Sequence, residues 1–377
     1  MSAKLSDQLS PPGDPARRAV TRVHHHLVLA LAAEVGAIGI VLVTWSQLRA
    51  FDQSLRIGAP GPAIARVVEI IFGLAVLVVP AYGGRAITRS LRARRLAGDG
   101  NLPDARIAAQ DAGHDLLYVL GFGLMAAIIA FAAFFLASNH GHVRTVLFNW
   151  DLIWSSRTAL LHGFWWNIKL FLVAQVLVLI WALIVAVVRQ LPGGAFAPLR
   201  FLAIAYADVF RGVPAIIVIY LIGFGFPLAH VEPFASHMTG NTQLFWLGVL
   251  ALVLVYGAYV AEVYRAGLES IHWSQTSAAR SLGLSQWQTL RYVVIPQAVR
   301  RIMPPLLNDF VALQKDTALV SVIALPEILL NAEILKSNHF NLSPVTGAAL
   351  FFLVITIPCT RFVDHLIKRD KARTQAH

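Results

Sequence analysis

The chain has 377 residues, of which 57% are hydrophobic and 14% are charged, and its mean hydropathy is +0.65. These values exclude an ordinary soluble domain and indicate an integral membrane protein. The net charge of +11 would suit nucleic-acid binding. However, the basic residues occur in short patches between apolar segments, which is typical of membrane proteins, so we predict membrane lipid and no nucleic acid as a partner. The single cysteine, Cys359, excludes an intramolecular disulfide and a four-thiolate metal site, and no metal site is predicted.

A helix needs about 20 mostly apolar residues to cross the ~30 Å hydrocarbon core of a bilayer. The chain therefore predicts an all-α integral membrane protein with about eight transmembrane helices. The first apolar run is too long for a cleavable signal, so we expect it to stay in the membrane as an anchor. The predicted spans are 27–45, 63–82, 116–137, 164–188, 213–228, 244–261, 304–328 and 345–362.

The distribution of basic residues predicts the orientation of these spans. If the N-terminus is inside, the inner segments contain most of the lysines and arginines of the chain. Both termini are therefore predicted to be cytoplasmic, because cytoplasmic segments carry the excess of positive charge. The outer segments then contain only Arg49, Arg56, Arg144, Arg157 and Lys336.

The spans and the segments between them predict five parts. The second part contains an Arg-rich connection at 83–112, which we interpret as an exposed cytoplasmic loop that sets topology and contacts lipid. The fourth part contains a polar cytoplasmic loop at 262–296. The predicted parts are a cytoplasmic N-terminal tail (1–26), a region with three spans (27–137), an outer loop (138–159), a five-span core (160–365) and a basic cytoplasmic tail (366–377).

The polar loop contains the stretch SAARSLGLSQWQTLRYVVIP at 277–296. Ser274 is predicted to cap a short helix, and Gly283 to end that helix in a left-handed conformation. Ser285 with Gln288 has the pattern of a capping box that begins a second helix, which Pro296 is predicted to limit. A connection between two spans does not need two capped helices. The pattern therefore favours a rigid cytoplasmic surface on which a partner docks.

This loop resembles the EAA loop of ABC importer permeases, with Ser277, Ala278 and Ala279 followed by Gly283 and Pro296 at the family spacing. The chain departs from the family pattern at Ser277, where the family has glutamate, which puts the strength of docking in doubt. Flanking stretches are similar to the polar amino-acid (histidine, glutamine and glutamate) permeases. These stretches are YADVFRGVP at 206–214, AYVAEVYRAGLESI at 258–271 and VIPQAVRRIMPPLLNDFVALQKDTALVSVI at 294–323.

The resemblance implies a type I importer permease core with three extra N-terminal helices, in the inner membrane of a bacterium. It implies a dimeric cytoplasmic ATPase that uses ATP and Mg, a second permease that is identical or homologous, and an outer solute-binding protein. The chain itself is expected to bind no cofactor and to catalyse no reaction. The residues that the resemblance assigns to ATPase coupling are Ser274, Ser277, Ala278, Ala279, Arg280, Gly283 and Pro296, and its signature residues are Arg211, Gly212, Pro214 and Glu262.

The seventh span is unusually polar. Charged groups at bilayer depth cost about 2.5–3.5 kcal/mol each on insertion scales, so they should face protein or water. Two interpretations remain open for this polar arc: a structural network at an interface, or a lining of the amino-acid pathway. Glu262 and Arg265 are predicted to form an ion pair beside the polar loop, and Lys169 to extend toward the outer interface. The residues of the polar arc are Asn308, Asp309, Lys315, Asp316 and Thr317, together with Gln314.

Two functions from different classes follow. The first is a permease subunit of an ATP-driven importer for a polar amino acid, of the glutamate, glutamine or basic type. It requires a partner ATPase, because the chain has no phosphate-binding loop of its own. The second is an ion-gradient-driven secondary transporter or channel that uses the arc from Asn308 to Thr317. A membrane enzyme ranks last, because no zinc or nucleophile motif occurs.

Overall fold

A computed structural model describes residues 15–56, 62–139, 141–232 and 238–375 of the protein. All regular elements within these ranges are helices, and none is a strand. The predicted all-α class is therefore confirmed. The chain forms two compact units, Met1–Val146 and Leu147–His377.

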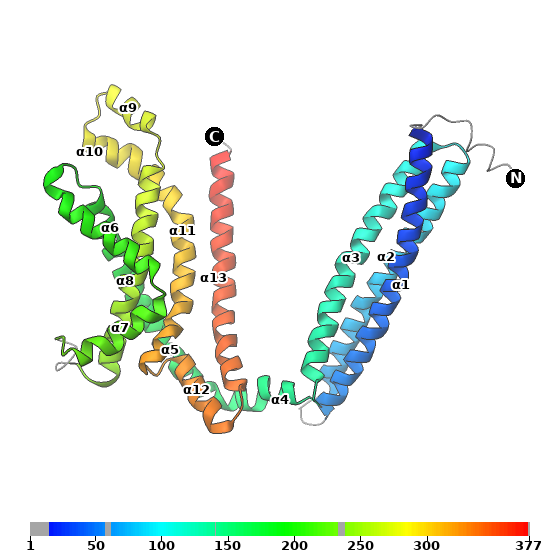
Figure 1. Cartoon of the computed structure of the whole chain (residues 1–377), viewed down its shortest axis with the longest axis horizontal. Coiled ribbons are helices and arrows are strands. Elements are labelled where there is room, and N and C mark those ends of the chain that lie inside the picture. The colour runs from blue at the N-terminus through cyan, green and yellow to red at the C-terminus, as the bar shows by residue number, and fades with distance from the viewer. Residues whose placement is uncertain (1–14, 57–61, 140, 233–237, 376–377) are drawn as a thin grey trace. The chain divides into compact units, whose positions relative to one another are not determined.

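The first unit is a bundle of three long helices that pack side by side (Figure 1). They are α1 (Pro15–Arg56), α2 (Pro62–Gly98) and α3 (Leu102–Ala137), and a short α4 (His142–Leu147) follows. At ~1.5 Å per residue, the 36 residues of α3 extend for about 54 Å. This length exceeds the ~30 Å hydrocarbon core, so α3 must continue beyond the bilayer.

The prediction of an exposed loop at 83–112 is wrong. Helix α2 continues to Gly98 and α3 begins at Leu102, so a single tight turn separates them. The arginines lie on helices, and Arg89 forms an ion pair with buried Asp115 at 2.9 Å. The helices extend this far because small side chains on both let their backbones pack closely. The buried small residues are Ala86, Ala93, Ala105, Ala108, Ala109 and Ala112.

The second unit is built around α8, whose side chains form much of the largest buried core together with those of α5, α7 and the end of α11. The predicted outer loop 138–159 is also partly helical, because α5 begins at Trp150 with Asn149 as its N-cap. The helices of this unit are α5 (Trp150–Arg189), α6 (Ala197–Gly212), α7 (Ala215–Leu228), α8 (Gly240–Glu269), α9 (Trp273–Ser281), α10 (Gln286–Thr289), α11 (Ile295–Asp316), α12 (Ile328–His339) and α13 (Ser343–Gln375), with short helical turns η1 (Gly194–Phe196), η2 (Leu290–Val294) and η3 (Thr317–Ile323).

The predicted fifth span, 213–228, coincides with α7, which α6 meets at an angle of 106°. The break lies at Val213, which is extended, and at Pro214, which is the N-cap of α7. Proline has no amide hydrogen for the helix and disfavours the helical conformation at the residue before it. The two helices therefore form a bent pair.

The predicted seventh span, 304–328, is not one straight helix. It belongs to a helical run from Gln286 to Ile323 that then bends by 52° into α12. Ala324 adopts a left-handed conformation with φ +67 and ends the run.

Five helices in the described part of the chain are long and apolar enough to cross a membrane, or up to seven spans if each bent pair counts as one. The prediction of 63–82 falls on α2, where the side chains of residues 62–76 lie outside the described residues. Residues 1–14 of the predicted N-terminal tail and residues 376–377 of the predicted C-terminal tail also lie outside the described residues. Eight spans and cytoplasmic termini therefore remain predictions.

Candidate functional site

The polar loop between α8 and α11 begins with α9, and His272 is its N-cap. The His272 ring accepts a hydrogen bond from the Ser274 amide at 3.3 Å and lies 2.8 Å from the Ser274 hydroxyl. The prediction of Ser274 as the cap is therefore wrong, because Ser274 lies inside the first turn and the imidazole takes the capping role. The loop projects beyond the ends of the neighbouring helices (Figure 1).

Helix α9 ends at the predicted glycine. Gly283 has φ +85 and donates its amide to the Arg280 carbonyl, and the next amide, of Leu284, donates to the Ala279 carbonyl at 3.2 Å. This pair of bonds is the Schellman arrangement, which favours glycine at the left-handed position. A Cβ at Gly283 would meet nothing within 4 Å. The requirement for glycine therefore comes from the backbone angle and not from crowding.

The predicted capping box is confirmed. The Ser285 amide donates to the Gln288 side chain at 2.8 Å, and the Gln288 amide donates to the Ser285 hydroxyl at 3.2 Å. Two reciprocal bonds satisfy amides that a helix start leaves unpaired. Helix α10 thus begins at a defined residue.

Pro296 does not end this second helix, contrary to the prediction. Helix α10 continues through η2, a π-helical turn in which the Ile295 amide donates to the Leu290 carbonyl, and into α11. Pro296 lies in the first turn of α11, where a missing amide hydrogen is tolerated. The loop is therefore joined rigidly to α11.

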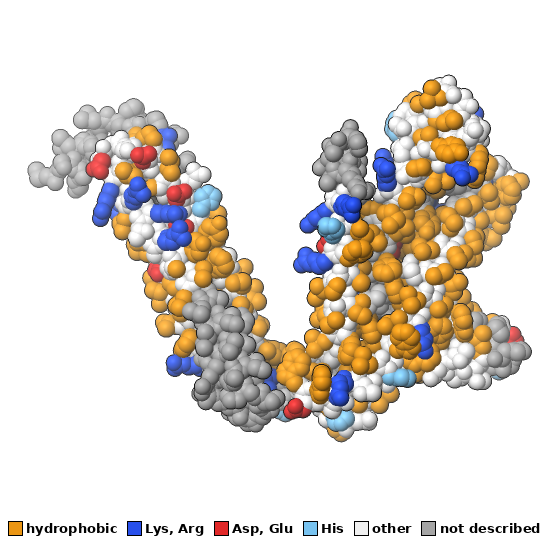
Figure 2. Space-filling view, turned by 180° about the vertical axis from the view of Figure 1, so that it is seen from behind, with side chains coloured by type: hydrophobic (Ala, Val, Ile, Leu, Met, Phe, Trp, Pro, Cys, Tyr) orange, Lys and Arg blue, Asp and Glu red, His pale blue; other side chains and the backbone are white. Residues whose placement is uncertain are grey.

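Large apolar side chains are exposed on this loop. Trp273 is 70% exposed, Leu282 83% and Trp287 65%. Ser277 is also exposed, whereas Ala279 is buried, with 4% exposure. Figure 2 shows hydrophobic side chains at the tip of this projection. Exposed apolar patches of this kind mark surfaces where a protein or a membrane binds.

Glu262 lies near the end of α8, just before the loop. Its carboxylate pairs with arginines from three helices. It accepts from Arg265 of α8 at 3.1 Å, which confirms the predicted ion pair. It also pairs with Arg189 at the end of α5 at 2.7 Å, and with the signature residue Arg211 at the end of α6 at 3.5 Å. Glu262 therefore joins the ends of α5 and α6 to the helix that leads into the loop.

A cavity of about 360 Å³ lies beside this cluster, between α8, the start of α11 and the end of α6. Its charged lining residues carry both signs: Arg211 and Arg301 are positive, and Glu262 and Asp309 are negative. One carboxylate oxygen of Asp309 is buried without a hydrogen-bond partner in the described structure. Arg211 and Glu262 in this lining pair with each other, so the Asp309 oxygen is the lining charge whose hydrogen bonding the described structure leaves unsatisfied.

The residues of the polar arc predicted on the seventh span do not face one common surface, because they contact different helices. Asp316 accepts a hydrogen bond from Tyr256 of α8 at 2.7 Å, and Gln314 accepts one from Thr356 of α13 at 2.9 Å. Thr317 is fully buried. Only Asn308 and Lys315 are exposed.

A buried polar network around Glu327 was not predicted from the sequence. Glu327 is 0% exposed, caps α12 by accepting from the Leu330 amide, and accepts from the Asn167 amide group at 2.9 Å. Asn167 of α5 also accepts from the Ile328 amide at 3.0 Å and donates to Thr317 at 3.2 Å. An asparagine inside an apolar span and a glutamate before a helix start are signals that could have revealed it.

Lys169 packs against two tryptophans of α5, and its extension toward the outer interface stays a prediction. Its ammonium group lies 4.1 Å from the centre of the Trp166 ring and 5.9 Å from that of Trp165. An ammonium over an indole face is stabilised by a cation–π interaction. No cluster of metal-ligating side chains occurs among the residues whose placement is described.

The chain matches a known protein family and several known relatives. Residues 193–371 match the family of binding-protein-dependent transport system inner membrane components. The chain is 32% identical over 232 residues to the glutamine transport system permease protein GlnP of Escherichia coli (strain K12), covering 59% of this chain and 98% of that protein. It is 35% identical over 208 residues to the glutamate transport system permease protein GluC of Corynebacterium glutamicum, covering 53% and 89%.

A solved structure agrees with these relatives. The crystal structure of an amino acid ABC transporter with histidines has 29% identity and a TM-score of 0.51, covering 57% of this chain and 95% of that one. The match confirms the resemblance found in the loop and its flanking stretches. The chain therefore belongs to the binding-protein-dependent transport system inner membrane component family, as a permease subunit of an amino-acid ABC importer.

Proposed function

We propose that this permease imports a polar amino acid and is driven by a separate ATPase that docks on the loop at 274–290. The observation that carries the proposal is the loop itself, which has two capped helices, a Schellman turn at Gly283 and exposed tryptophans. As a member of its family the chain is a transport subunit and not an enzyme. ATP and Mg would be used by the partner.

The loop suits transmission of movement because it is stiff at both ends. Helix α10 passes without interruption into α11, and Arg301 of α11 donates to the Ser270 carbonyl at the end of α8. Gly267 lets these helices approach closely, since a Cβ there would lie 2.1 Å from the Ile302 side chain. Movement of the loop would therefore move α8 and α11 together.

The mixed charges of the cavity support an amino acid as cargo. A zwitterion needs a cation for its carboxylate and an anion for its ammonium group. Arg211 and Arg301 line the cavity as cations, and Asp309, with an oxygen that has no hydrogen-bond partner in the described structure, is an anion. We propose that this cavity lies on the cytoplasmic part of the pathway, and that Asn308 and Lys315 face the same route. We propose that the cargo is glutamate, glutamine or a basic amino acid.

The proposed assembly contains two permeases, an ATPase dimer and an outer solute-binding protein in the bacterial inner membrane. The alternative, an ion-gradient-driven transporter, relies on a continuous polar arc. Asp316, Gln314 and Thr317 instead bond to α8, α13 and α5. No feature of the described residues favours the alternative over the importer.

The test is to purify the chain gently from its native membrane and to identify copurified proteins by mass spectrometry. An ATP-binding subunit should copurify and should be lost when Trp273 and Trp287 are both replaced by alanine. A matched control is the replacement of Trp150 and Trp154 by alanine, since both are exposed but lie at the start of α5.

Reconstitution then tests the cargo. Vesicles that contain the complex should accumulate labelled glutamine or glutamate only with ATP. Accumulation by the chain alone under an ion gradient would refute the importer proposal.

A further inference from the structure

The part of the chain that contains the polar loop has basic residues but no acidic ones. Between residues 270 and 308 the sequence contains neither aspartate nor glutamate. All arginines of this stretch are exposed, namely Arg280, Arg291, Arg300 and Arg301. No carboxylate within the stretch can therefore neutralise them.

The guanidinium of Arg280, in the last turn of α9, has no counter-group. Its side chain has no hydrogen bond, ion pair or ring contact with any described residue. By contrast, Arg301 donates to the Ser270 carbonyl, and Arg291 lies over the Tyr292 ring at 5.8 Å from its centre. A guanidinium is always charged and has five donor hydrogens. Arg280 therefore has both its charge and its donors available to a group from another molecule.

Arg280 shares one face of α9 with Trp273 and Ser277. At ~100° per residue, the three positions lie within about 60° of one another around the helix. All three residues are exposed, whereas Ala279, on the other side of the helix, is buried. Tryptophan and arginine are enriched among the residues that contribute most to binding between proteins. The face formed by Trp273, Ser277 and Arg280 therefore has the composition of a protein interface.

Ser277 lies three residues before Arg280, at the spacing from which a carboxylate on the same helix would pair with the guanidinium. Serine has no charge, so the permease leaves Arg280 uncompensated. A charge that an interface covers without a counter-charge costs free energy, and a guanidinium fits a carboxylate with two parallel hydrogen bonds. We propose that the ATPase groove that receives this loop carries a carboxylate that pairs with Arg280, beside apolar residues that contact Trp273. This inference rests on the proposed function, since it names the chemistry of the same docking partner.

Anionic lipid headgroups are the other groups that would neutralise Arg280. The loop projects beyond the ends of the neighbouring helices of its unit (Figure 1). Along the chain, the ion pairs of Glu262 lie between the predicted span 244–261 and α9. The face with Arg280 thus lies beyond the charged residues that end α8, which favours a cytoplasmic protein over the membrane surface.

The test titrates the full chain in detergent micelles with the ATP-binding subunit that copurifies with it, at low and at physiological ionic strength. Arg280→Gln should raise the dissociation constant by about ten- to a hundredfold at low ionic strength, because a hydrogen-bonded charge pair is lost. It should also make binding less sensitive to salt, which screens exposed charges. Arg300→Gln is the control, since Arg300 is also exposed but lies on α11, and it should leave the dissociation constant nearly unchanged.

A pair of variants at Ser277 tests the sign of the partner's charge. Ser277→Glu gives Arg280 a partner on its own helix and repels a carboxylate of the ATPase. It should therefore bind the ATPase more weakly than Ser277→Gln, which has nearly the same size and no charge. A purely structural role of Arg280 at the end of α9 would not produce this order, since a glutamate one turn before an arginine stabilises a helix.

Three results would overturn the proposal while the proposed function stands. They are unchanged binding by Arg280→Gln, tighter or equal binding by Ser277→Glu relative to Ser277→Gln, and an Arg280→Gln variant that loses binding only to phosphatidylglycerol vesicles. If the unmodified chain binds no ATP-binding subunit, the proposed function fails together with this inference, so the two failures are distinguished.

Discussion

At the scale of single residues, Gly283 is needed for its backbone angle alone, because φ is +85 and the space around it is open. We expect Gly283→Val to abolish coupled uptake, since a left-handed residue with a Cβ costs about 1–2 kcal/mol and a β-branched side chain costs more. Gly283→Asn should keep most uptake, because asparagine tolerates this conformation. ATP-driven uptake by reconstituted vesicles measures both, and equal uptake by the two variants would contradict the prediction.

Glu262 is the residue through which three helices meet. We expect Glu262→Gln to lower the free energy of unfolding by about 1.5–3 kcal/mol, since charge-assisted bonds to Arg189 and Arg265 weaken. Glu269→Gln is the control: this exposed carboxylate forms an ion pair with Arg265, and such surface pairs contribute about 0–1 kcal/mol. Thermal unfolding of the purified variants gives the comparison, and equal losses would show that the cluster at Glu262 is not special.

At the scale of elements, the contact between α5 and α12 depends on Gly163. A Cβ there would lie 2.8 Å from the Ile328 Cα and 2.9 Å from the Glu327 carbonyl carbon. Backbone atoms cannot move aside as a flexible side chain can. We therefore expect Gly163→Ala to destabilise the protein by about 1–3 kcal/mol. Gly225→Ala, in open space in α7, should be neutral or stabilising by about 1 kcal/mol through helix propensity. The denaturation midpoints of the two variants are compared with that of the unmodified protein, and equal midpoints for both variants would contradict the prediction.

The π-helical turn η2 determines how the loop is joined to α11. We expect Pro296→Ala to keep both folding and uptake, because the helix already passes through this position. Deleting Val293 should abolish uptake in a folded protein, because one residue fewer rotates the loop by about 100° relative to α11. Circular dichroism and uptake measured together test this. Loss of uptake in Pro296→Ala would favour the original interpretation of Pro296 as a stop.

At the scale of the whole molecule, the family match lies entirely within the second unit, at 193–371. We expect a chain that begins at Leu147 to insert and to support ATP-driven uptake with its partners, since GlnP is matched over 98% of its length by 59% of this chain. Basic residues such as Arg189 and Arg265 should still direct orientation. Protease accessibility measures the orientation of the shortened chain in the membrane, and uptake by vesicles measures its transport activity. A folded but inactive truncated chain would assign the first unit a role in transport.

The local signals of the polar loop could be read from the sequence because they depend on neighbouring residues. Gly283 needs only its own backbone angle, and Ser285 with Gln288 forms two bonds within one turn. The cap of α9 was missed because histidine is an uncommon N-cap. Pro296 was misread because a π-helical turn has no clear pattern in the sequence.

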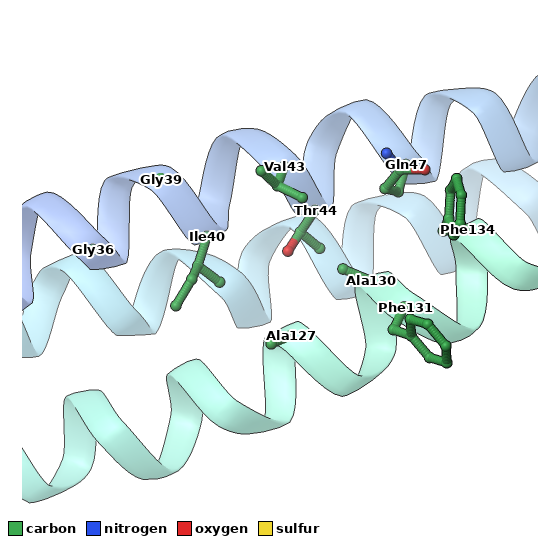
Figure 3. A pocket seen from close by; sticks show the side chains of 10 residues that line it. All are labelled: Gly36, Gly39, Ile40, Val43, Thr44, Gln47, Ala127, Ala130, Phe131 and Phe134. Atoms are coloured by element: carbon green, nitrogen blue, oxygen red, sulfur yellow. The ribbon is translucent and has the colours of Figure 1, made fainter.

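Composition and the spacing of motifs determined the membrane class, the all-α fold and the amino-acid permease family, because hydropathy, turn chemistry and motif spacing are properties of the chain itself. Tertiary structure alone decided which polar groups meet. Asn167 and Glu327 are far apart in sequence but share a hydrogen bond, and Glu262 of α8 pairs with Arg189 of α5 and Arg211 of α6. The same holds for the groove between α1 and α3 that is lined by Gly36, Gly39 and Ala127 (Figure 3), which exists only because these two helices pack side by side. Such contacts arise from packing between distant segments, and no local pattern encodes them.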